Sequence, residues 1–358
     1  MPAWRQAFLL DVDMTGLSSR TPVPESVPAL GCAGLDAAGV PYAVSEPSIR
    51  LGRVAGVRLV VRAEERTRAH AALVSRGARE ILVPPDLLAS TATHLLLPDE
   101  TSGHLFHVEV AELPAVRGGR EMPGSARLCR GGAMVAVVGG DGAGKSTVVA
   151  ALVAWLGEAL DVAPVHLGKP RRTAVGLLVK GSVALGRRLR LLPSDRWGHY
   201  PTEEQHRGVF PGYAWLLWQV TTAHDRRRLY RRAESYVNDG ALVVADRFPL
   251  AQLTLMDGSR TRWLSGLELG RLAARLVRYE QQCYQGIRRP DVVLVLRVDP
   301  EIAVARKTGV DPADFVRPRS AEVFDADWSG SGIRVVDASR DRDEVLRSVR
   351  AEVWKGLL

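Results

Sequence analysis

The residues best suited to chemistry in this chain stand in one short glycine-rich turn. Gly139, followed by Gly144, Lys145 and Ser146, fits the phosphate-binding pattern G-x-x-x-x-G-K-[ST]. Glycines at this spacing let backbone N–H groups close around phosphate oxygens, which the positive end of a following helix also attracts. Lys145 is predicted to reach the β- and γ-phosphates, and the Ser146 hydroxyl to hold Mg²⁺. The turn therefore predicts a site for a nucleoside triphosphate such as ATP.

The strand and the helix that must position this turn are also visible in the sequence. Residues 134–138 are five apolar residues, rich in valine, which is typical of a buried parallel strand. After the turn, Val148, Leu152 and Leu156 recur at helical spacing. A strand before and a helix after distinguish a phosphate loop from a glycine-rich connector with a chance lysine.

A second candidate for the site is the aspartate that ends a later apolar strand. Residues 241–248 read ALVVADRF, with Asp246 and Arg247 at the strand end. A carboxylate in this place can hold a Mg²⁺-bound water or position the acceptor of a phosphoryl group, although an aspartate that caps a loop gives the same pattern. The preceding residues 212–240 predict one long helix. Its second half carries Arg226, Arg227, Arg228, Arg231 and Arg232.

The rest of the chain after the turn alternates strands with helices. Residues 288–307 predict a strand and then a helix entered through Asp299-Pro300, and residues 333–354 predict a last strand and a closing helix. The alternation indicates an α/β fold with a doubly wound parallel sheet and a site at the strand ends. Between them, residues 307–320 are loop-like and suit a lid that closes over a triphosphate. The cations of this segment are Lys307, Arg317 and Arg319.

Taken in order, these motifs resemble those of thymidylate kinases. The resemblance rests on GGDGAGKST at residues 139–147, the triplet Asp246-Arg247-Phe248, residues 289–307, the lid segment and VVDASRDRDEV at residues 335–345. It covers about residues 133–358. It implies a Mg²⁺-dependent transfer of the ATP γ-phosphoryl group to a small-molecule acceptor, most simply a nucleoside monophosphate or a related phosphorylated metabolite. It also implies a homodimer.

The same resemblance implies a role for each matching residue. Asp141 would lie next to the acceptor, and Arg226 and Arg247 would contact the acceptor phosphate. The implied catalytic residues are Lys145, Asp141, Asp246, Arg247, Arg317 and Arg319. The implied nucleotide-binding residues are Gly139, Gly142, Gly144, Lys145, Ser146 and Thr147, with Ala338, Ser339 and Arg340 beside the adenine. The implied metal ligands are Ser146 and Asp246.

Departures from the family pattern leave the acceptor open. Val138 stands where these kinases usually carry a glutamate, PLAQLTLMDG replaces a serine-rich run ending in Tyr-Gln, and residues 170–212 have no counterpart. Two alternatives follow: a kinase of a sugar or nucleoside-like hydroxyl in a polysaccharide or natural-product pathway, or a non-catalytic ATP-binding regulator or assembly factor. A phosphorylated acceptor should need Arg226 and Arg247, whereas a neutral one should tolerate their loss better.

The first part of the chain predicts a separate, smaller domain. Residues 29–113 give an αβαβ plan with a closing hairpin across 101–103, which resembles the minimal nucleotidyltransferase fold. That family carries paired aspartates where Arg58 and its neighbours stand, and Glu109 is the one carboxylate that could serve. A single carboxylate cannot hold the two metal ions of that chemistry. We therefore predict a degenerate nucleotidyltransferase-like domain at residues 1–120 that binds or regulates, a linker at 121–132, and the kinase-like domain at 133–358.

Composition limits the remaining classes. The chain has 358 residues and a formal net charge of +8, but no long basic run with interleaved aromatic residues, so nucleic-acid binding is not indicated. The Asp11-x-Asp13 pair matches the opening of haloacid-dehalogenase-type phosphatases, but a proline-rich loop follows it. Residues 173–192 alternate apolar and basic residues, so a helix there would pack on the domain, cover a substrate or touch a membrane surface. Three scattered cysteines and the lack of a membrane-spanning run predict a cytoplasmic protein.

Overall fold

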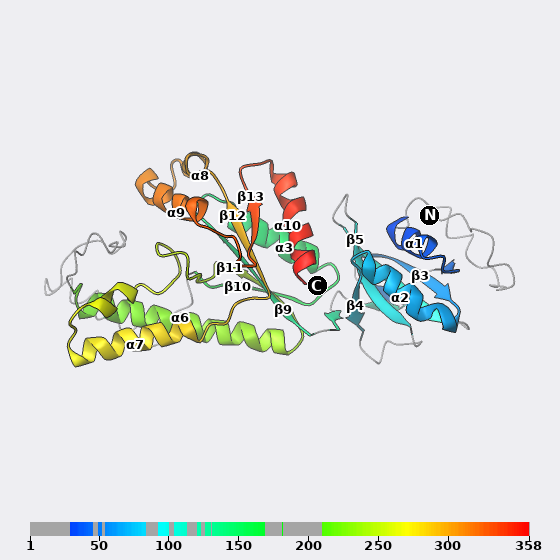
Figure 1. The fold of residues 1–358 in the computed structure, drawn as a ribbon, viewed down its shortest axis with the longest axis horizontal. Helices are drawn as coiled ribbons and strands as arrows, with labels where there is room; N and C mark the ends of the chain where they lie inside the picture. The colour runs from blue at the N-terminus through cyan, green and yellow to red at the C-terminus, as the bar shows by residue number, and fades with distance from the viewer. Residues whose placement is uncertain are drawn as a thin grey trace.

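The computed structural model describes residues 29–45, 49–51, 54–83, 92–99, 104–112, 120–122, 126–129, 131–168, 181 and 210–357. Over these ranges the chain forms two larger β-sheets, each with its own helices (Figure 1). None of the helices in these ranges is long and apolar enough to cross a membrane. The Asp11-x-Asp13 pair, and residues 173–192 apart from position 181, lie outside the described residues.

The first sheet has six strands in the order β1-β3-β6-β5-β4-β8. Its pairs are antiparallel except β3 with β6, which run parallel. Pro98 pairs with Leu105, so β5 and β6 form the antiparallel pair that the sequence predicted on either side of residues 101–103. The elements are α1 (Ala29–Ala37), β1 (Ala43–Ser45), β3 (Ala55–Val61), η3 (Ala63–Glu65), α2 (Arg66–Ser75), β4 (Arg79–Leu82), β5 (Thr93–Pro98), β6 (Leu105–Glu112) and β8 (Arg127–Leu128).

One face of the first sheet is covered by two helices. Leu35 of α1 and Leu73 of α2 are fully buried in one cluster with Leu59 of β3 and Val110 of β6. The alternation along β3 and β6 thus places these apolar residues toward α1 and α2 and their neighbours in sequence toward the opposite face. A separate pair of short parallel strands, β2 (Ile49–Leu51) and β7 (Arg120–Met122), lies outside this sheet.

The second sheet has five parallel strands in the order β10-β11-β9-β12-β13. Helices follow the strands, as parallel connections require. The predicted doubly wound α/β fold is therefore confirmed for this part of the chain. The strands are β9 (Ala133–Gly139), β10 (Val162–His166), β11 (Leu242–Asp246), β12 (Val292–Arg297) and β13 (Arg334–Asp337). The helices are α3 (Lys145–Leu156), α6 (Tyr213–Asn238), η5 (Arg262–Gly266), α7 (Arg271–Gln285), α8 (Pro300–Lys307), α9 (Ala313–Asp325) and α10 (Arg342–Gly356).

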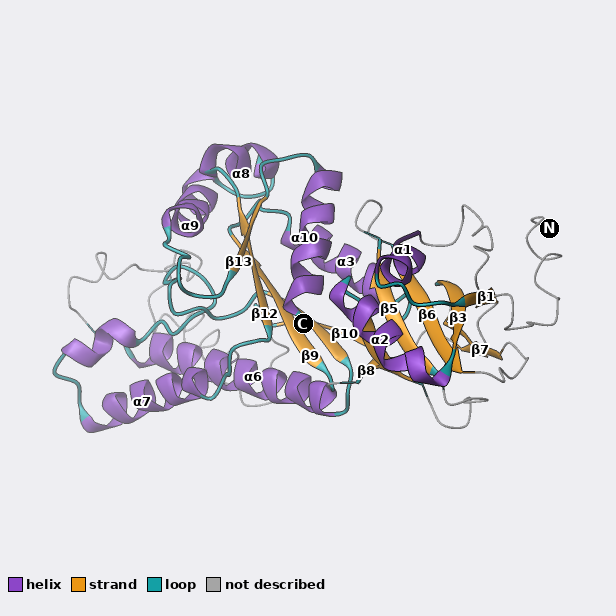
Figure 2. Cartoon of the chain, turned by 45° about the vertical axis from the view of Figure 1, so that its right-hand side comes forward, coloured by secondary structure: helices purple, strands orange, loops and turns teal. Residues whose placement is uncertain are grey.

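Helices cover both faces of the second sheet. Figure 2 shows the strands passing between α3 and α10 on one side and α6 on the other. Leu152 of α3 and Val349 of α10 pack in one cluster with Val135 and Val137, whereas Tyr230 of α6 packs against the opposite face. The helix α7 lies beside α6 rather than on the sheet (Figure 1).

Two parts of the sequence interpretation are corrected by the structure. The predicted linker at 121–132 contains β8 and the end of β7, and β8 pairs with β4 of the first sheet. The loop-like lid segment at 307–320 is largely helical, because α9 begins at Ala313 and runs through Pro318. Val316, Ser320 and Val323 are buried at helical spacing on this helix, and that periodicity was obscured by the prolines and charges around it.

The two larger sheets share one apolar core. A single buried cluster contains Ile81, Leu96 and Leu105 of the first domain together with Leu152 and Trp155 of α3. At its edge, the Trp354 indole of α10 donates a hydrogen bond of 2.7 Å to the carbonyl of Gly77. The rings of Trp354 and Trp155 also meet edge to face, with their centroids 6.0 Å apart. The first sheet thus contributes to the same buried cluster as the helix that follows the phosphate loop, and Gly77 contacts α10 directly.

Candidate functional site

The phosphate loop lies between the buried strand β9 and the helix α3, as the sequence predicted. Gly142 and Gly144 have φ values of 87° and 85°, in the left-handed region that favours glycine. At Gly142 a Cβ atom would come within 2.5 Å of the Ala303 carbonyl oxygen of α8, so only glycine fits. The glycines therefore hold the backbone in a tight turn directly before Lys145, the first residue of α3. Thr147, in the first turn of α3, is exposed.

Lys145 is buried within this turn. Its side chain is 7% exposed, and its Nζ donates a hydrogen bond of 2.6 Å to the Gly140 carbonyl. Burial and then the charge of Arg247 lower the pKa of Lys145 to about 8, while Asp141 acts in the opposite direction. The ammonium group is thus held where a phosphate oxygen would stabilise its charge.

Asp141 is the centre of a cluster of cations. Its Oδ1 lies 2.9 Å from an Arg247 guanidinium nitrogen and 3.9 Å from Lys145 Nζ, and its Oδ2 lies 3.9 Å from Arg319 Nε. Burial alone would raise the pKa of the Asp141 carboxyl, but these three cations together hold it below its ordinary value. The structure therefore gathers four of the predicted site residues from the loop, the end of β11 and α9.

Arg247 connects this cluster to Asp257, which sequence reasoning missed. Arg247 follows the last residue of β11 and has a φ of 68°, an uncommon value for a side chain of this size. Its guanidinium reaches Asp141 on one side and an Asp257 oxygen at 3.4 Å on the other. The sequence did offer one signal for Asp257. It stands ten positions after Arg247 in an Asp-Gly pair, which is typical of a turn.

Arg226 of α6 lies behind Asp257 and is almost fully buried. Its guanidinium donates to the carbonyls of Leu167 and Gly168 at 2.8 and 3.1 Å and to the Tyr284 hydroxyl at 2.6 Å. It also donates to the carbonyl and the carboxylate of Asp257. These five contacts match the five N–H groups of an arginine. The predicted contact of Arg226 with an acceptor phosphate stays a prediction, and it would require Arg226 to exchange one of these bonds.

Asp246 is placed where a metal ligand is expected. It ends β11 beside Val137 of β9, two residues before the first glycine of the loop. Its Oδ2 contacts His166 Nδ1 at 2.9 Å, whereas its Oδ1 is buried and has no hydrogen-bond partner. His166, at the end of β10, was not singled out by the sequence analysis as a site residue.

The side chains around Asp246 have the chemistry that a Mg²⁺ site requires. The described part of the chain holds no cluster of three or more His, Cys, Asp or Glu side chains suited to a metal. Mg²⁺ needs no such cluster, because it keeps several waters and binds one or two carboxylates together with substrate phosphates. The unpartnered oxygen of Asp246 and the exposed Ser146 hydroxyl at the start of α3 supply oxygen ligands of that kind.

The two predicted lid arginines face different surroundings. Arg319 is buried, approaches Asp141 and stacks over the Phe315 ring at 3.6 Å. Arg317 is exposed and forms a two-point contact with Glu301 of α8, at 2.6 and 3.0 Å. Both arginines lie on α9, but they are two residues apart and therefore leave the helix on different sides. Arg319 faces the phosphate loop, and Arg317 faces solvent. The structure therefore brings Arg319 into the cluster and leaves Arg317 outside it.

The residues predicted beside the adenine lie directly after β13. The Ala338 amide donates to the Arg297 carbonyl at 2.7 Å, and the Ser339 hydroxyl accepts from the Asp299 amide at 3.4 Å. Arg340 is exposed and pairs with Asp337 and Glu344. This segment therefore joins the ends of β12 and β13 at the same edge as the phosphate loop. Its contact with a nucleotide base stays a prediction.

The first domain holds a different cluster of buried polar side chains. Arg58 of β3 and Glu109 of β6 are register partners on parallel strands, and their side chains form an ion pair of 2.9 Å. His94 of β5 is the register partner of Glu109 from the other side, and its Nδ1 lies 3.0 Å from His107 Nε2. Arg58 and Glu109 are 4% and 0% exposed. The carboxylate expected to survive from a metal site is thus paired with an arginine on the next strand.

The site combines a phosphate loop between a buried strand and a helix with a strand-end aspartate and converging cations. Together these features define a P-loop nucleotide-binding domain. No family model matches the sequence. The thymidylate kinase of Symbiobacterium thermophilum is 28% identical to the chain over 221 residues, which are 59% of this chain and 88% of that protein. YghR of Escherichia coli K12, described as an uncharacterized ATP-binding protein, is 27% identical over 229 residues, 62% of this chain and 86% of its own. The chain therefore contains a thymidylate kinase-like P-loop domain, as its motifs predicted.

Among solved structures, a thymidylate kinase from Candida albicans aligns with 18% identity and a TM-score of 0.38. The alignment covers 63% of this chain and 90% of the Candida albicans protein.

Proposed function

We propose that this protein is an ATP-dependent phosphotransferase that moves the γ-phosphoryl group of Mg-ATP to a small-molecule acceptor. The observation that carries the proposal is the convergence of Lys145, Arg247 and Arg319 on Asp141 at the ends of the parallel strands. Catalysis of phosphoryl transfer consists mainly of positioning and of neutralising charge, and this cluster supplies cations from three directions. The similarity to proteins named as a thymidylate kinase and an ATP-binding protein supports the same class.

Each side chain has a defined task in this proposal. Lys145 leaves the Gly140 carbonyl and binds a phosphate oxygen of ATP, which stabilises its charged form. Arg319 and Arg247 neutralise charge on the transferring group and on the acceptor, and Asp141 keeps both guanidinium groups in place when the site is empty. Bound Mg²⁺, held through Ser146 and Asp246, would neutralise the phosphates that these side chains do not reach.

The acceptor proposed first is a nucleoside monophosphate or a related phosphorylated metabolite, because Arg247 lies beside Asp141 with an exposed portion of its side chain. One observation favours a second candidate, a neutral hydroxyl acceptor. All five donors of Arg226 are used within the protein, so one of the two arginines expected to bind an acceptor phosphate has no donor left over in this arrangement. A neutral acceptor would not need that donor.

The deciding experiment is ADP release with Mg-ATP over a panel of acceptors. The panel contains dTMP and other nucleoside monophosphates, free nucleosides, sugars and sugar phosphates, each tested with the wild type and with Lys145→Ala. Turnover of one acceptor that is lost in the variant would support the kinase and name its substrate class. ATP binding without turnover of any acceptor would favour a non-catalytic regulator instead, and undiminished turnover in Lys145→Ala would remove the phosphate loop from the mechanism.

Arg247→Ala separates the two acceptor classes. With a phosphorylated acceptor, we expect the variant to raise the KM for that acceptor by about tenfold or more, since a charge-assisted hydrogen bond to phosphate is lost. With a neutral acceptor, the KM should change little, and the loss should appear mainly in kcat.

A further inference from the structure

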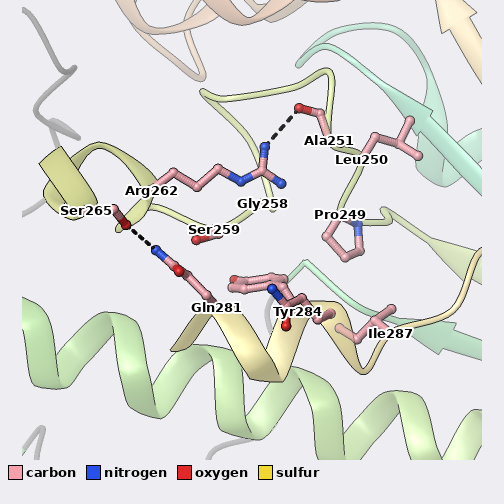
Figure 3. Close-up of a pocket in the computed structure, with 11 residues that line it drawn as sticks. Pro249, Leu250, Ala251, Gly258, Ser259, Arg262, Ser265, Gln281, Tyr284 and Ile287 are labelled. Carbon is pink, nitrogen blue, oxygen red and sulfur yellow. Dashed lines mark hydrogen bonds between the residues drawn. The ribbon is translucent and has the colours of Figure 1, made fainter. Parts of the chain in front are cut away.

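A pocket of about 430 Å³ lies between the segment that follows β11 and the helix α7. Figure 3 shows Arg262, Ser265 and Gln281 on one side of it, and Pro249, Leu250 and Ile287 on the other. The Tyr284 ring lies between the two sides. The volume falls within the range of pockets that bind small molecules.

This pocket is distinct from the phosphate site. Asp141, Lys145, Asp246 and Arg247 are not among its lining residues. The turn at Asp257-Gly258 separates the two, because the Asp257 carboxylate faces Arg226 and Arg247 whereas Gly258 lines the pocket. The pocket and the charged contacts of Asp257 therefore lie on opposite sides of this turn.

The wall of the pocket is held in place by a buried carboxylate. Glu280 of α7 is 1% exposed and accepts hydrogen bonds from the Ser259 hydroxyl at 2.6 Å, the Thr261 hydroxyl at 2.8 Å and the Arg260 amide at 3.1 Å. Three bonds to one carboxylate fix the loop between Gly258 and η5 against α7. A loop fixed in this way keeps its pocket open without a ligand, which lowers the entropy lost on binding.

The two sides of the pocket differ in chemistry. On the polar side, Gln281 donates to the Ser265 hydroxyl at 2.9 Å, and Arg262 donates one hydrogen bond to the Ala251 carbonyl at 3.2 Å. Over the described part of the chain Arg262 forms no ion pair, although its charge acts at longer range on the Glu280 carboxylate. Its one hydrogen bond leaves its other donors to an anion. On the other side, Pro249, Leu250 and Ile287 offer apolar surface beside the Tyr284 ring. The matching ligand is small, with an anionic group at one end and a flat apolar ring at the other.

Tyr284 connects this pocket to the phosphate loop. Its ring lines the pocket, and its hydroxyl accepts a 2.6 Å hydrogen bond from Arg226. Arg226 binds Asp257, Asp257 binds Arg247, and Arg247 binds Asp141 of the loop. A ligand that shifts the Tyr284 ring therefore acts on the first member of a continuous chain of charged contacts.

We propose that this pocket is an effector site for a small ring-bearing phosphate or carboxylate, and that its occupancy changes ATP affinity through Tyr284. Such coupling must be reciprocal, so ATP changes the affinity of the effector by the same factor. The proposal does not depend on which acceptor the enzyme uses, nor on turnover, because both of its observables are binding constants.

The ligand for the binding test is phenyl phosphate, and its two halves, inorganic phosphate and phenol, are tested beside it. Calorimetry measures the binding of all three. We expect phenyl phosphate to bind the wild type and Lys145→Ala alike, and each half to bind more weakly. Arg262→Ala should weaken phenyl phosphate binding about tenfold, as loss of a charge-assisted bond predicts, with ATP binding retained. Equal binding by Arg262→Ala, or loss of binding in Arg247→Ala instead, would place the ligand in the phosphate site and overturn the proposal.

The coupling is tested with Tyr284→Phe, which keeps the ring and removes the hydroxyl. Saturating phenyl phosphate should change the Kd for ATP in the wild type by a factor of about three or more, and by less than about 1.5 in the variant. Thermal unfolding verifies that the variant is folded. An unchanged ATP Kd in the wild type, or the same change in both proteins, would refute the effector role. If no acceptor were phosphorylated, the kinase proposal would fail, but the binding of phenyl phosphate and its effect on the Kd for ATP would still be measurable.

Discussion

Buried charges occur in both domains, but the two clusters are built in opposite ways. In the first domain Arg58 faces Glu109 on the neighbouring strand, one cation against one anion on a closed sheet face. In the second domain the cluster stands at the carboxyl ends of parallel strands and is unbalanced. Its carboxylates are Asp141, Asp246 and Asp257, and its cations are Lys145, Arg226, Arg247 and Arg319.

This difference in charge balance indicates which of the two buried clusters is suited to binding a ligand. In a pair on a sheet face each charge neutralises the other, so removing one partner leaves a buried charge and destabilises the fold. An excess of cations around a glycine turn is unfavourable in the empty protein and becomes favourable when phosphate arrives. The comparison therefore predicts that substitutions in the first cluster change stability, and that those in the second change function.

The largest effect is expected for Lys145→Met. Loss of the ammonium should lower kcat/KM by about 10³-fold, since an electrostatic contact to the transferring phosphate disappears. The melting temperature should be equal to or above that of the wild type, because burial disfavours the charged form of Lys145. Without Lys145, the Asp141 carboxylate still lies beside the guanidinium groups of Arg247 and Arg319. Kinetics and thermal unfolding of the same preparation test both parts. A large drop in melting temperature would mean that Lys145 stabilises the fold, as the Arg58–Glu109 pair is expected to do in the first domain.

Asp246→Asn is expected to follow in size. The variant keeps the shape and the contact with His166 but loses the charge, so kcat should fall about 10²-fold while the Kd for ATP changes less than about threefold. Turnover with increasing Mg²⁺ and ATP binding by calorimetry measure the two quantities. Equal losses in both would assign Asp246 to ATP binding or to structure rather than to the transfer step.

Glu109→Gln tests the other cluster. Removing the carboxylate leaves the Arg58 guanidinium buried without it, so the free energy of unfolding should fall by about 3 kcal/mol. Activity per folded molecule should stay within about twofold. Urea unfolding gives the first quantity, and turnover normalised to the folded fraction gives the second. Arg58→Met with Glu109→Gln should recover part of the lost stability, and failure to recover any would argue against the pair as its origin.

Arg319 and Arg317 offer a matched comparison on one helix. Arg319→Ala should lower kcat about tenfold, because its guanidinium approaches Asp141, whereas Arg317→Ala should change kcat less than twofold, since that side chain pairs with Glu301 at the surface. Steady-state kinetics with the acceptor found in the panel decides between them. If Arg317→Ala had the larger effect, α9 would have to rotate when substrates bind.

The smallest effect is a pH dependence from the first cluster. Burial lowers the pKa of His94, Glu109 opposes this and Arg58 adds to it. A histidine with a lowered pKa in the folded state contributes stability that is present above its unfolded value of about 6.5 and is lost as the pH falls below it. Melting temperatures between about pH 5 and 8 should therefore decline on the acid side, with a shallower decline in His94→Gln. Identical profiles would remove His94 as the cause.

Local pattern in the sequence was enough to predict most of the second domain. Three features could be predicted from residues that are adjacent in the sequence. They are the valine-rich strand before Gly139, the carboxylate at Asp246 and the proline at the start of α8. The helix α9 was missed because Pro318 and the surrounding charges obscure its buried face, which is formed by Val316 and Val323.

Contacts between distant segments could not be predicted in this way. Asp257 joins the site through Arg226 and Arg247, which come from a helix and a strand end. The pairing of Arg58 with Glu109 depends on strand register, which the sequence of either strand alone does not determine. The same limit applies to Tyr284, whose pocket is formed only when the segment after β11 lies against α7.

The hydrogen bond between Trp354 and Gly77 joins residues 277 positions apart. At translation rates of about 5–20 residues per second, the ribosome needs roughly 15–55 s to make the intervening chain. During that time Ile81, Leu96 and Leu105 lack the residues of α10 that share their buried cluster in the finished protein. The nascent first domain therefore presents an apolar surface while synthesis continues, and chaperones that bind such surfaces have a defined place to act on this chain.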